Sequence, residues 1–203
     1  MKNPELCNDL YEKGKSITLL MSHYGNWEWS AITPRYLKHK VLPIYKPLHN
    51  PHFDRMIKKS RERFGAETIP MDKIMRTLME YKIKGIPTLT FFIADQRPRW
   101  AQIQYWTTFL NQDTPVILGP EKIARKMDHA VLFLKITPVK RGHYEAEYIS
   151  LFEHTGETMP YEITDSYLAI LEKTIREKPE YWLWTHDRWK HEKEKFVQKA
   201  RPV

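Results

Sequence analysis

The chain has 203 residues, of which 41% are hydrophobic and 29% are charged, a size and balance typical of one folded domain with its own core. Its formal net charge of +8 predicts an acidic partner, which is a nucleic acid, an anionic lipid or an acidic carrier protein. The sequence has no zinc-finger spacing, no RNA-recognition signature and no basic leucine-zipper pattern. We therefore expect no nucleic-acid partner.

Cysteine content and hydropathy indicate the compartment of the chain and its relation to a membrane. The single cysteine, Cys7, excludes an intrachain disulfide and a cysteine-based metal cluster, and it suits a reducing compartment. No stretch approaches the roughly 20 apolar residues of a membrane-spanning helix. The opening Met1-Lys-Asn-Pro4 lacks the apolar run of a signal peptide. We expect any membrane contact of this chain to be peripheral.

The first third of the chain alternates helices and strands. In chain order, we predict a helix at 4–14, a strand at 16–21, a helix at 27–38, a strand at 41–45 and a helix at 51–64. Asn26 is placed to cap the second helix, and Asn50-Pro51 is a favourable helix opening because proline fits the first helical position. Gly14 and Gly65 are placed to end the first and third helices.

The rest of the chain continues this alternation. We predict a strand at 67–70, a helix at 72–84, a strand at 88–93, a long loop at 95–115, a helix at 115–127, strands at 130–137 and 144–151, and a helix at 161–177 before an aromatic-rich tail. Strands that alternate with helices are typical of a mostly parallel sheet covered by helices on both faces. The expected fold is therefore α/β, and the absence of repeats and linkers predicts a single domain over 1–203.

A histidine and a glutamate flank the turn between the first predicted strand and the next helix. The segment Ser22-His-Tyr-Gly-Asn-Trp-Glu28 places His23 at the carboxyl end of a strand, where open α/β sheets bind their ligands. Gly25 permits a tight turn, which can bring Glu28 back toward the imidazole. Such a pair serves acyl transfer, because histidine can take a proton from a hydroxyl and a carboxylate can orient the ring. The alternative is a structural histidine beside a solvated glutamate.

Further candidates accompany this pair. The helix at 51–64 carries a basic flank that includes Arg55 and fits a lipid phosphate, an acidic protein or only solvent. Asp95-Gln96-Arg97 follows the strand at 88–93, where Arg97 can clamp a phosphate or join a loop salt bridge. Trp106 can wall an acyl-chain groove or pack in the core. The candidate substrate-binding residues are Asn26, Arg55, Asp95, Gln96, Arg97 and Trp106, and we predict no catalytic metal.

Several blocks together resemble one family. Residues 22–29 (Ser-His-Tyr-Gly-Asn-Trp-Glu-Trp) are similar to the His-x4-Asp/Glu block of the lysophospholipid acyltransferase superfamily, in the form found in bacterial lipid A late acyltransferases. Tyr45–Asp54 with Arg61 and Gly65, then Ala94–Pro98 with 109–124, and finally Pro179–Lys190 resemble the later blocks, in the same order. The resemblance covers nearly the whole chain. Members usually carry an N-terminal membrane helix ahead of the first block, which this chain is expected to lack.

The resemblance implies an enzyme that needs no cofactor. His23 acts as general base and Glu28 orients it, while the acyl donor is a thioester on acyl carrier protein or coenzyme A. The implied acceptor is a hydroxyl of a lipid A precursor at the cytoplasmic face of the bacterial inner membrane. Two alternatives stay open, namely another acceptor such as a lysophospholipid, glycolipid or aminolipid, and a non-catalytic basic domain that binds anionic lipid.

Overall fold

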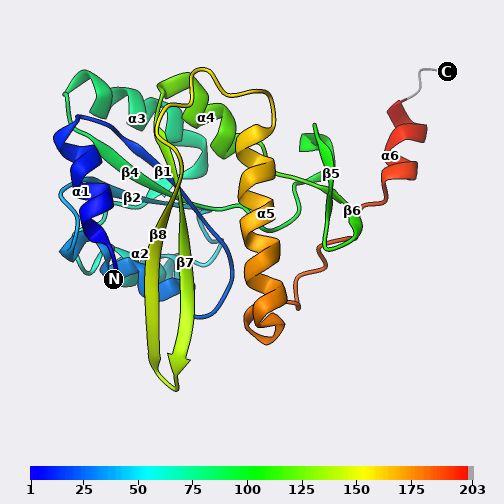
Figure 1. The fold of residues 1–203 in the computed structure, drawn as a ribbon, viewed down its shortest axis with the longest axis horizontal. Coiled ribbons are helices and arrows are strands. Elements are labelled where there is room, and N and C mark those ends of the chain that lie inside the picture. The colour runs from blue at the N-terminus through cyan, green and yellow to red at the C-terminus, as the bar shows by residue number, and fades with distance from the viewer. Residues whose placement is uncertain (201–203) are drawn as a thin grey trace.

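A six-stranded sheet forms the centre of the computed structural model, which describes residues 1–200. The strands lie in the order β3 (Ile69–Pro70), β2 (Lys40–Tyr45), β4 (Thr88–Ile93), β1 (Ile17–Met21), β7 (Ala130–Lys140) and β8 (His143–Phe152). All neighbouring pairs are parallel except β7 and β8, which form a long antiparallel hairpin. Figure 1 shows this hairpin extending beyond the body of the molecule. The predicted mostly parallel sheet is confirmed.

Helices cover both faces of the sheet, as the sequence predicts. The α-helices are α1 (Pro4–Glu12), α2 (Pro51–Glu62), α3 (Ile74–Ile83), α4 (Gly119–Met127), α5 (Glu162–Glu177) and α6 (Lys193–Ala200). Side chains of β1 alternate between the faces, so that Leu19 joins the core beneath α1 and Leu20 joins the core beneath α5. A smaller apolar cluster holds α3 and α4 against β2. Among the described residues, no helix is long and apolar enough to cross a membrane.

The second predicted helix differs from the expectation in type. Residues Trp27–Arg35 form a 3-10 helix, η1, rather than an α-helix to residue 38. Pro34 lies inside it and cannot donate a backbone hydrogen bond, which disfavours an α-helical continuation. Asn26 precedes η1, but its side chain makes no capping hydrogen bond, so that prediction is wrong. The other predicted cap is confirmed, because Asn50 accepts hydrogen bonds from the backbone N–H groups of His52 and Phe53.

Regular structure also occupies most of the segment that the sequence predicts to be a loop. After the short 3-10 helix η3 (Trp100–Gln102), strands β5 (Trp106–Phe109) and β6 (Gln112–Pro115) form an antiparallel hairpin. Its two-residue turn is Leu110-Asn111, and both residues have positive φ, 50° and 61°. The usual Asn-Gly turn signal is absent, which explains why the hairpin could not be predicted. In Figure 1, α5 stands between the main sheet and this hairpin.

The central position of β1 sets where the functional site forms. β1 pairs with β4 on one side and β7 on the other, and Met21 lies opposite Ile93 in the parallel register. The carboxyl ends of β1 and β4 therefore meet at the same edge of the sheet. Residues that follow the two strands, 22–24 and 94–96, are brought together there although about 70 residues separate them in sequence.

Candidate active site

His23 lies in a tight turn directly after β1. All residues of β1 are buried, which fixes the strand, and the His23 side chain remains 17% exposed. Gly25 completes the turn with a φ of 60°, and a Cβ there would lie 3.4 Å from Cγ2 of Ile136. That Cβ contact is an ordinary van der Waals distance, so the positive φ is what strains a larger residue and favours glycine at this position. The Trp27 ring packs against the imidazole in a T-shaped arrangement, with 5.1 Å between ring centroids.

Asp95 is the carboxylate that contacts His23. Its Oδ1 lies 2.7 Å from Nδ1 of His23, and its Oδ2 accepts from the His23 backbone N–H at 3.0 Å. The Trp182 indole N–H donates to the same Oδ2 at 2.9 Å. Asp95 is 2% exposed, so these donors replace the water that its charge would otherwise require. The structure therefore places Asp95 against the imidazole, and the predicted substrate-binding role of Asp95 stays a prediction.

This contact fixes which ring nitrogen can act as a base. A carboxylate only accepts hydrogen bonds, so Nδ1 of His23 must carry the proton in the neutral ring. The lone pair then lies on Nε2, whose neighbour is the side-chain amide of Gln96, with its nitrogen 3.4 Å away. Besides Asp95, Gln96 is thus the predicted substrate-binding residue that the structure places beside the imidazole.

Glu28 does not make the expected contact with the imidazole. Its two carboxylate oxygens bind the Arg61 guanidinium, at 2.5 Å from Nη2 and 3.1 Å from Nε. Such a two-point pair suits the planar guanidinium, while Nδ1 of His23 already has Asp95 as its partner. The expected contact between Glu28 and the ring is therefore wrong, since Asp95 occupies that position. A catalytic role for Glu28 through Arg61 stays a prediction.

The segment after α5 holds the turn in place. Through the 3-10 helix η4 (Pro179–Tyr181) the chain returns to the sheet edge, where Trp182 forms an antiparallel bridge with Tyr24. The Gly25 N–H donates to the carbonyl of Tyr181 at 2.9 Å, and the Leu183 N–H donates to the carbonyl of His23 at 3.0 Å. We call residues 181–183 the C-terminal strap. The aromatic-rich tail thus contacts the candidate base directly.

Basic side chains also lie near the edge of the sheet that holds His23. Arg188 is 2% exposed and donates from Nη2 to the carbonyl of Pro115 at 2.7 Å, and its burial lowers its pKa to about 10. Burial also lowers the pKa of His186, with Arg97 and Arg188 acting in the same direction. Arg97 donates from Nη1 to the backbone carbonyl of Asp187. The sequence singled out Arg97 as a site residue, whereas Arg188 was only part of the aromatic-rich C-terminal block, and its burial was not predicted.

The remaining predicted residues lie apart from this cluster. Arg55 is exposed on α2, and Trp106 lies on β5, where its ring packs near Phe196. Within the described residues, Arg55, Trp106 and Asn26 make no hydrogen bond to His23 or Asp95. Their substrate-binding roles stay predictions. The described part of the chain also contains no group of three or more metal-ligating side chains, and the absence of a catalytic metal remains an expectation.

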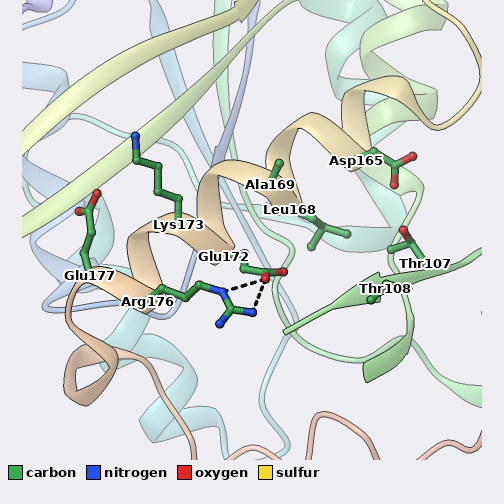
Figure 2. Close-up of a pocket in the computed structure, with 9 residues that line it drawn as sticks. All are labelled: Thr107, Thr108, Asp165, Leu168, Ala169, Glu172, Lys173, Arg176 and Glu177. Carbon is green, nitrogen blue, oxygen red and sulfur yellow. Dashed lines mark hydrogen bonds and ion pairs between the residues drawn. The ribbon is translucent and has the colours of Figure 1, made fainter. Parts of the chain in front are cut away.

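Two hollows in the described part of the chain differ in their relation to the candidate base. Figure 2 shows the larger, about 760 Å³, between α5 and β5, where Arg176 and Glu172 form an ion pair. Neither His23 nor Asp95 lines it. A narrow apolar cavity of about 40 Å³ lies between η1 and the sheet. Trp27, which packs on the imidazole, contributes to its wall, as does the Glu28–Arg61 pair. His23 and Asp95 do not line this smaller cavity either, and Trp27 is the residue that connects its wall to the imidazole.

A family comparison identifies this arrangement. Residues 2–191 match the family described as bacterial lipid A biosynthesis acyltransferase, and this match includes His23, Asp95 and the C-terminal strap. The chain belongs to the bacterial lipid A biosynthesis acyltransferase family. This family is the one that the sequence blocks resemble, in the order in which they occur.

Local similarity to another class of protein also exists. Stretches of 82 residues are 32% identical to pyruvate carboxylases of Aspergillus terreus and Aspergillus niger, and each covers 38% of this chain. A pyruvate carboxylase of Aspergillus terreus strain NIH 2624 is 30% identical over 81 residues. The chain spans only 7% of the length of these relatives. A match to so small a part of each enzyme carries no argument about their activity.

Proposed function

We propose that this acyltransferase moves a fatty acyl chain from an acyl thioester to a hydroxyl of a lipid A precursor, with His23 as general base and Asp95 as its positioning residue. The observation that carries the proposal is the buried Asp95–His23 hydrogen bond of 2.7 Å at the carboxyl edge of the sheet. It supports a base, because it leaves Nε2 of the ring unprotonated and directed away from the carboxylate.

The proposed reaction is a direct transfer. Nε2 of His23 takes the proton from the acceptor hydroxyl as its oxygen attacks the thioester carbonyl, and the new C–O bond gives a tetrahedral oxyanion. The oxyanion collapses, the C–S bond breaks, and the leaving thiolate takes the proton from the imidazolium. The negative charge of Asp95 stabilises the imidazolium between these two steps. No protein nucleophile, metal or cofactor is needed, and the thioester on acyl carrier protein or coenzyme A is a cosubstrate.

The apolar cavity beside Trp27 is our candidate for the start of the acyl-chain site. Much of its lining is apolar and comes from Met21, Ala31, Val41, Ile44, Phe91 and Ile93. Ligand sites usually measure about 300 Å³ or more, so a cavity of about 40 Å³ must widen to admit a chain. The Glu28–Arg61 pair at its wall connects η1 to α2, and movement of that pair would open the cavity. We place the reaction at the cytoplasmic face of the inner membrane.

The test is a comparison of His23→Ala with His154→Ala, in which an exposed histidine far along the sequence serves as control. Acyl transfer from a labelled acyl thioester to a lipid A precursor should be lost in His23→Ala and retained in His154→Ala. Unchanged transfer in His23→Ala would refute the proposed base. A wild-type chain that binds anionic lipid but transfers no acyl group would instead support the non-catalytic alternative.

The acceptor needs a separate measurement. Mass spectrometry of lipids from cells with and without the full-length protein should show a shift of one acyl chain in a lipid A glycolipid. A shift confined to glycerophospholipids or aminolipids would show that the same reaction uses another acceptor lipid. That outcome would refute a lipid A precursor as the acceptor and would leave the proposed roles of His23 and Asp95 unchanged.

A further inference from the structure

Helix α2 contributes no buried residue to the core, although it carries large apolar side chains. Phe53 and Met56 are 57% and 58% exposed, and Leu48, just before the helix, is 45% exposed. At 100° per residue, Phe53 and Met56 lie about 60° apart on the helix surface, so they form one apolar edge. Large apolar side chains that gather on an exposed face indicate a surface that is covered in function.

Basic side chains adjoin this apolar edge. Arg55, Lys59 and Arg63 are exposed and lie about 20° to 100° from Met56 around the helix. Within the described residues, none of the three forms an ion pair. The inward flank differs, because Arg61 binds Glu28 and Lys58 lies 3.9 Å from Glu62. The outward face of α2 is therefore apolar along one side and carries uncompensated positive charge along the other.

The position of α2 relates this face to the reaction. β1 and β2 are parallel members of one sheet, so both end at its carboxyl edge, where His23 lies. Helix α2 starts six residues after β2 ends, and the first turns of α2 therefore lie near this edge. Arg61 then links the helix to η1 through Glu28. In Figure 1, α2 lies at the lower left of the body. A membrane bound to this helix would thus lie near the edge of the sheet that holds His23.

We propose that the outward face of α2, with Leu48, is a docking surface for an anionic lipid bilayer. Helices of this kind lie in the plane of a membrane, with apolar side chains among the acyl chains and basic ones at the headgroups. Phe53, Met56 and Leu48 supply the first group, and Arg55 and Lys59 the second. The inference rests on the proposed function, because a lipid acceptor must be drawn from a bilayer into the site.

The test measures vesicle binding of the 203-residue chain without any substrate. Neutral phosphatidylcholine vesicles are compared with vesicles that also contain phosphatidylglycerol. We expect binding to the anionic vesicles that weakens with added salt. Phe53→Ser with Met56→Ser, and separately Arg55→Gln with Lys59→Gln, should each lower it by about tenfold.

The chain offers a chemically matched control on another helix. α3 also exposes apolar side chains, with Ile83 at 82% and Met79 at 43%, and Lys82 lies between them. This end of α3 leads to the amino end of β4, at the opposite edge of the sheet. Met79→Ser with Ile83→Ser should leave vesicle binding unchanged. Loss of binding in this α3 variant together with retention in both α2 variants would overturn the proposal.

Two further outcomes are informative. Equal binding to neutral and anionic vesicles, or binding of α2 to an acidic carrier protein in place of vesicles, would also overturn the proposal. His23→Ala should bind vesicles as the wild type does. A chain that binds through α2 but transfers no acyl group would refute the proposed function alone, so the two failures are distinguishable.

Discussion

Replacement of Asp95 by asparagine tests the proposed site most directly. In the wild type, Oδ1 accepts one N–H, from the His23 ring, and Oδ2 accepts two, from the His23 backbone and Trp182. Asparagine is nearly the same size but supplies one acceptor oxygen and one NH2 donor. Its oxygen should take the position with two donors, because an NH2 group there would leave two buried donors unsatisfied, at about 1–3 kcal/mol each.

In Asp95→Asn, the NH2 group of the introduced amide would then face Nδ1 of His23. The ring must accept at Nδ1 and carry its proton on Nε2, which is the wrong tautomer for a base. The same substitution in a serine protease triad lowers kcat about 10⁴-fold, and we expect a loss of about 10³- to 10⁴-fold here. That loss corresponds to about 4–5.5 kcal/mol at about 1.36 kcal/mol for each tenfold change.

Two measurements check this expectation. Initial rates of acyl transfer give the loss in kcat, and ¹⁵N chemical shifts of the histidine rings report the tautomer of His23. Asp72→Asn is the control, because Asp72 is an exposed aspartate in the short 3-10 helix η2 (Met71–Lys73). If Asp95→Asn keeps activity within tenfold of the wild type, or if its ring proton stays on Nδ1, the reasoning is refuted.

Two more predictions follow from buried groups. Trp182→Phe removes the indole donor to Asp95, and we expect kcat to fall roughly 10- to 100-fold, as for the loss of one hydrogen bond to a charged group. Trp184→Phe, at an exposed ring, is the control in the same rate assay. Equal losses of kcat in the two variants would contradict this role of Trp182. Burial lowers the pKa of His129 to about 4, with Lys82 acting in the same direction. The unfolded state binds more protons between pH 6.5 and 4, so stability should fall by about 2 kcal/mol from pH 7.5 to 5 in urea titrations. His129→Gln should lose less over that interval, and an identical loss would show that His129 is not the source.

The sequence predicted the elements whose signals are local. The apolar runs of β1 and β4 gave strands within a residue of their observed bounds, and Asn50-Pro51 marked the start of α2. The α/β class followed from their alternation. Local signals failed where backbone conformation was unusual, as in η1 with its internal Pro34 and in the Leu110-Asn111 turn.

The candidate site was predicted only in part, because its partners come from distant segments. The strand-turn setting identified His23, and the family resemblance supported it. The choice between Glu28 and Asp95 as the partner of the ring depends on β1 lying next to β4, which no local pattern reveals. The donor from Trp182 depends likewise on the return of the C-terminal strap to the sheet edge.

The C-terminal strap has a consequence for biosynthesis. The strands that carry His23 and Asp95 leave the ribosome long before residues 181–183, which complete the hydrogen bonds around them. A nascent chain can therefore fold much of its sheet while its imidazole turn is still unsupported. Activity should emerge only after residues 181–183 have left the ribosome, and chains terminated before residue 181 should be inactive even where their sheet has formed.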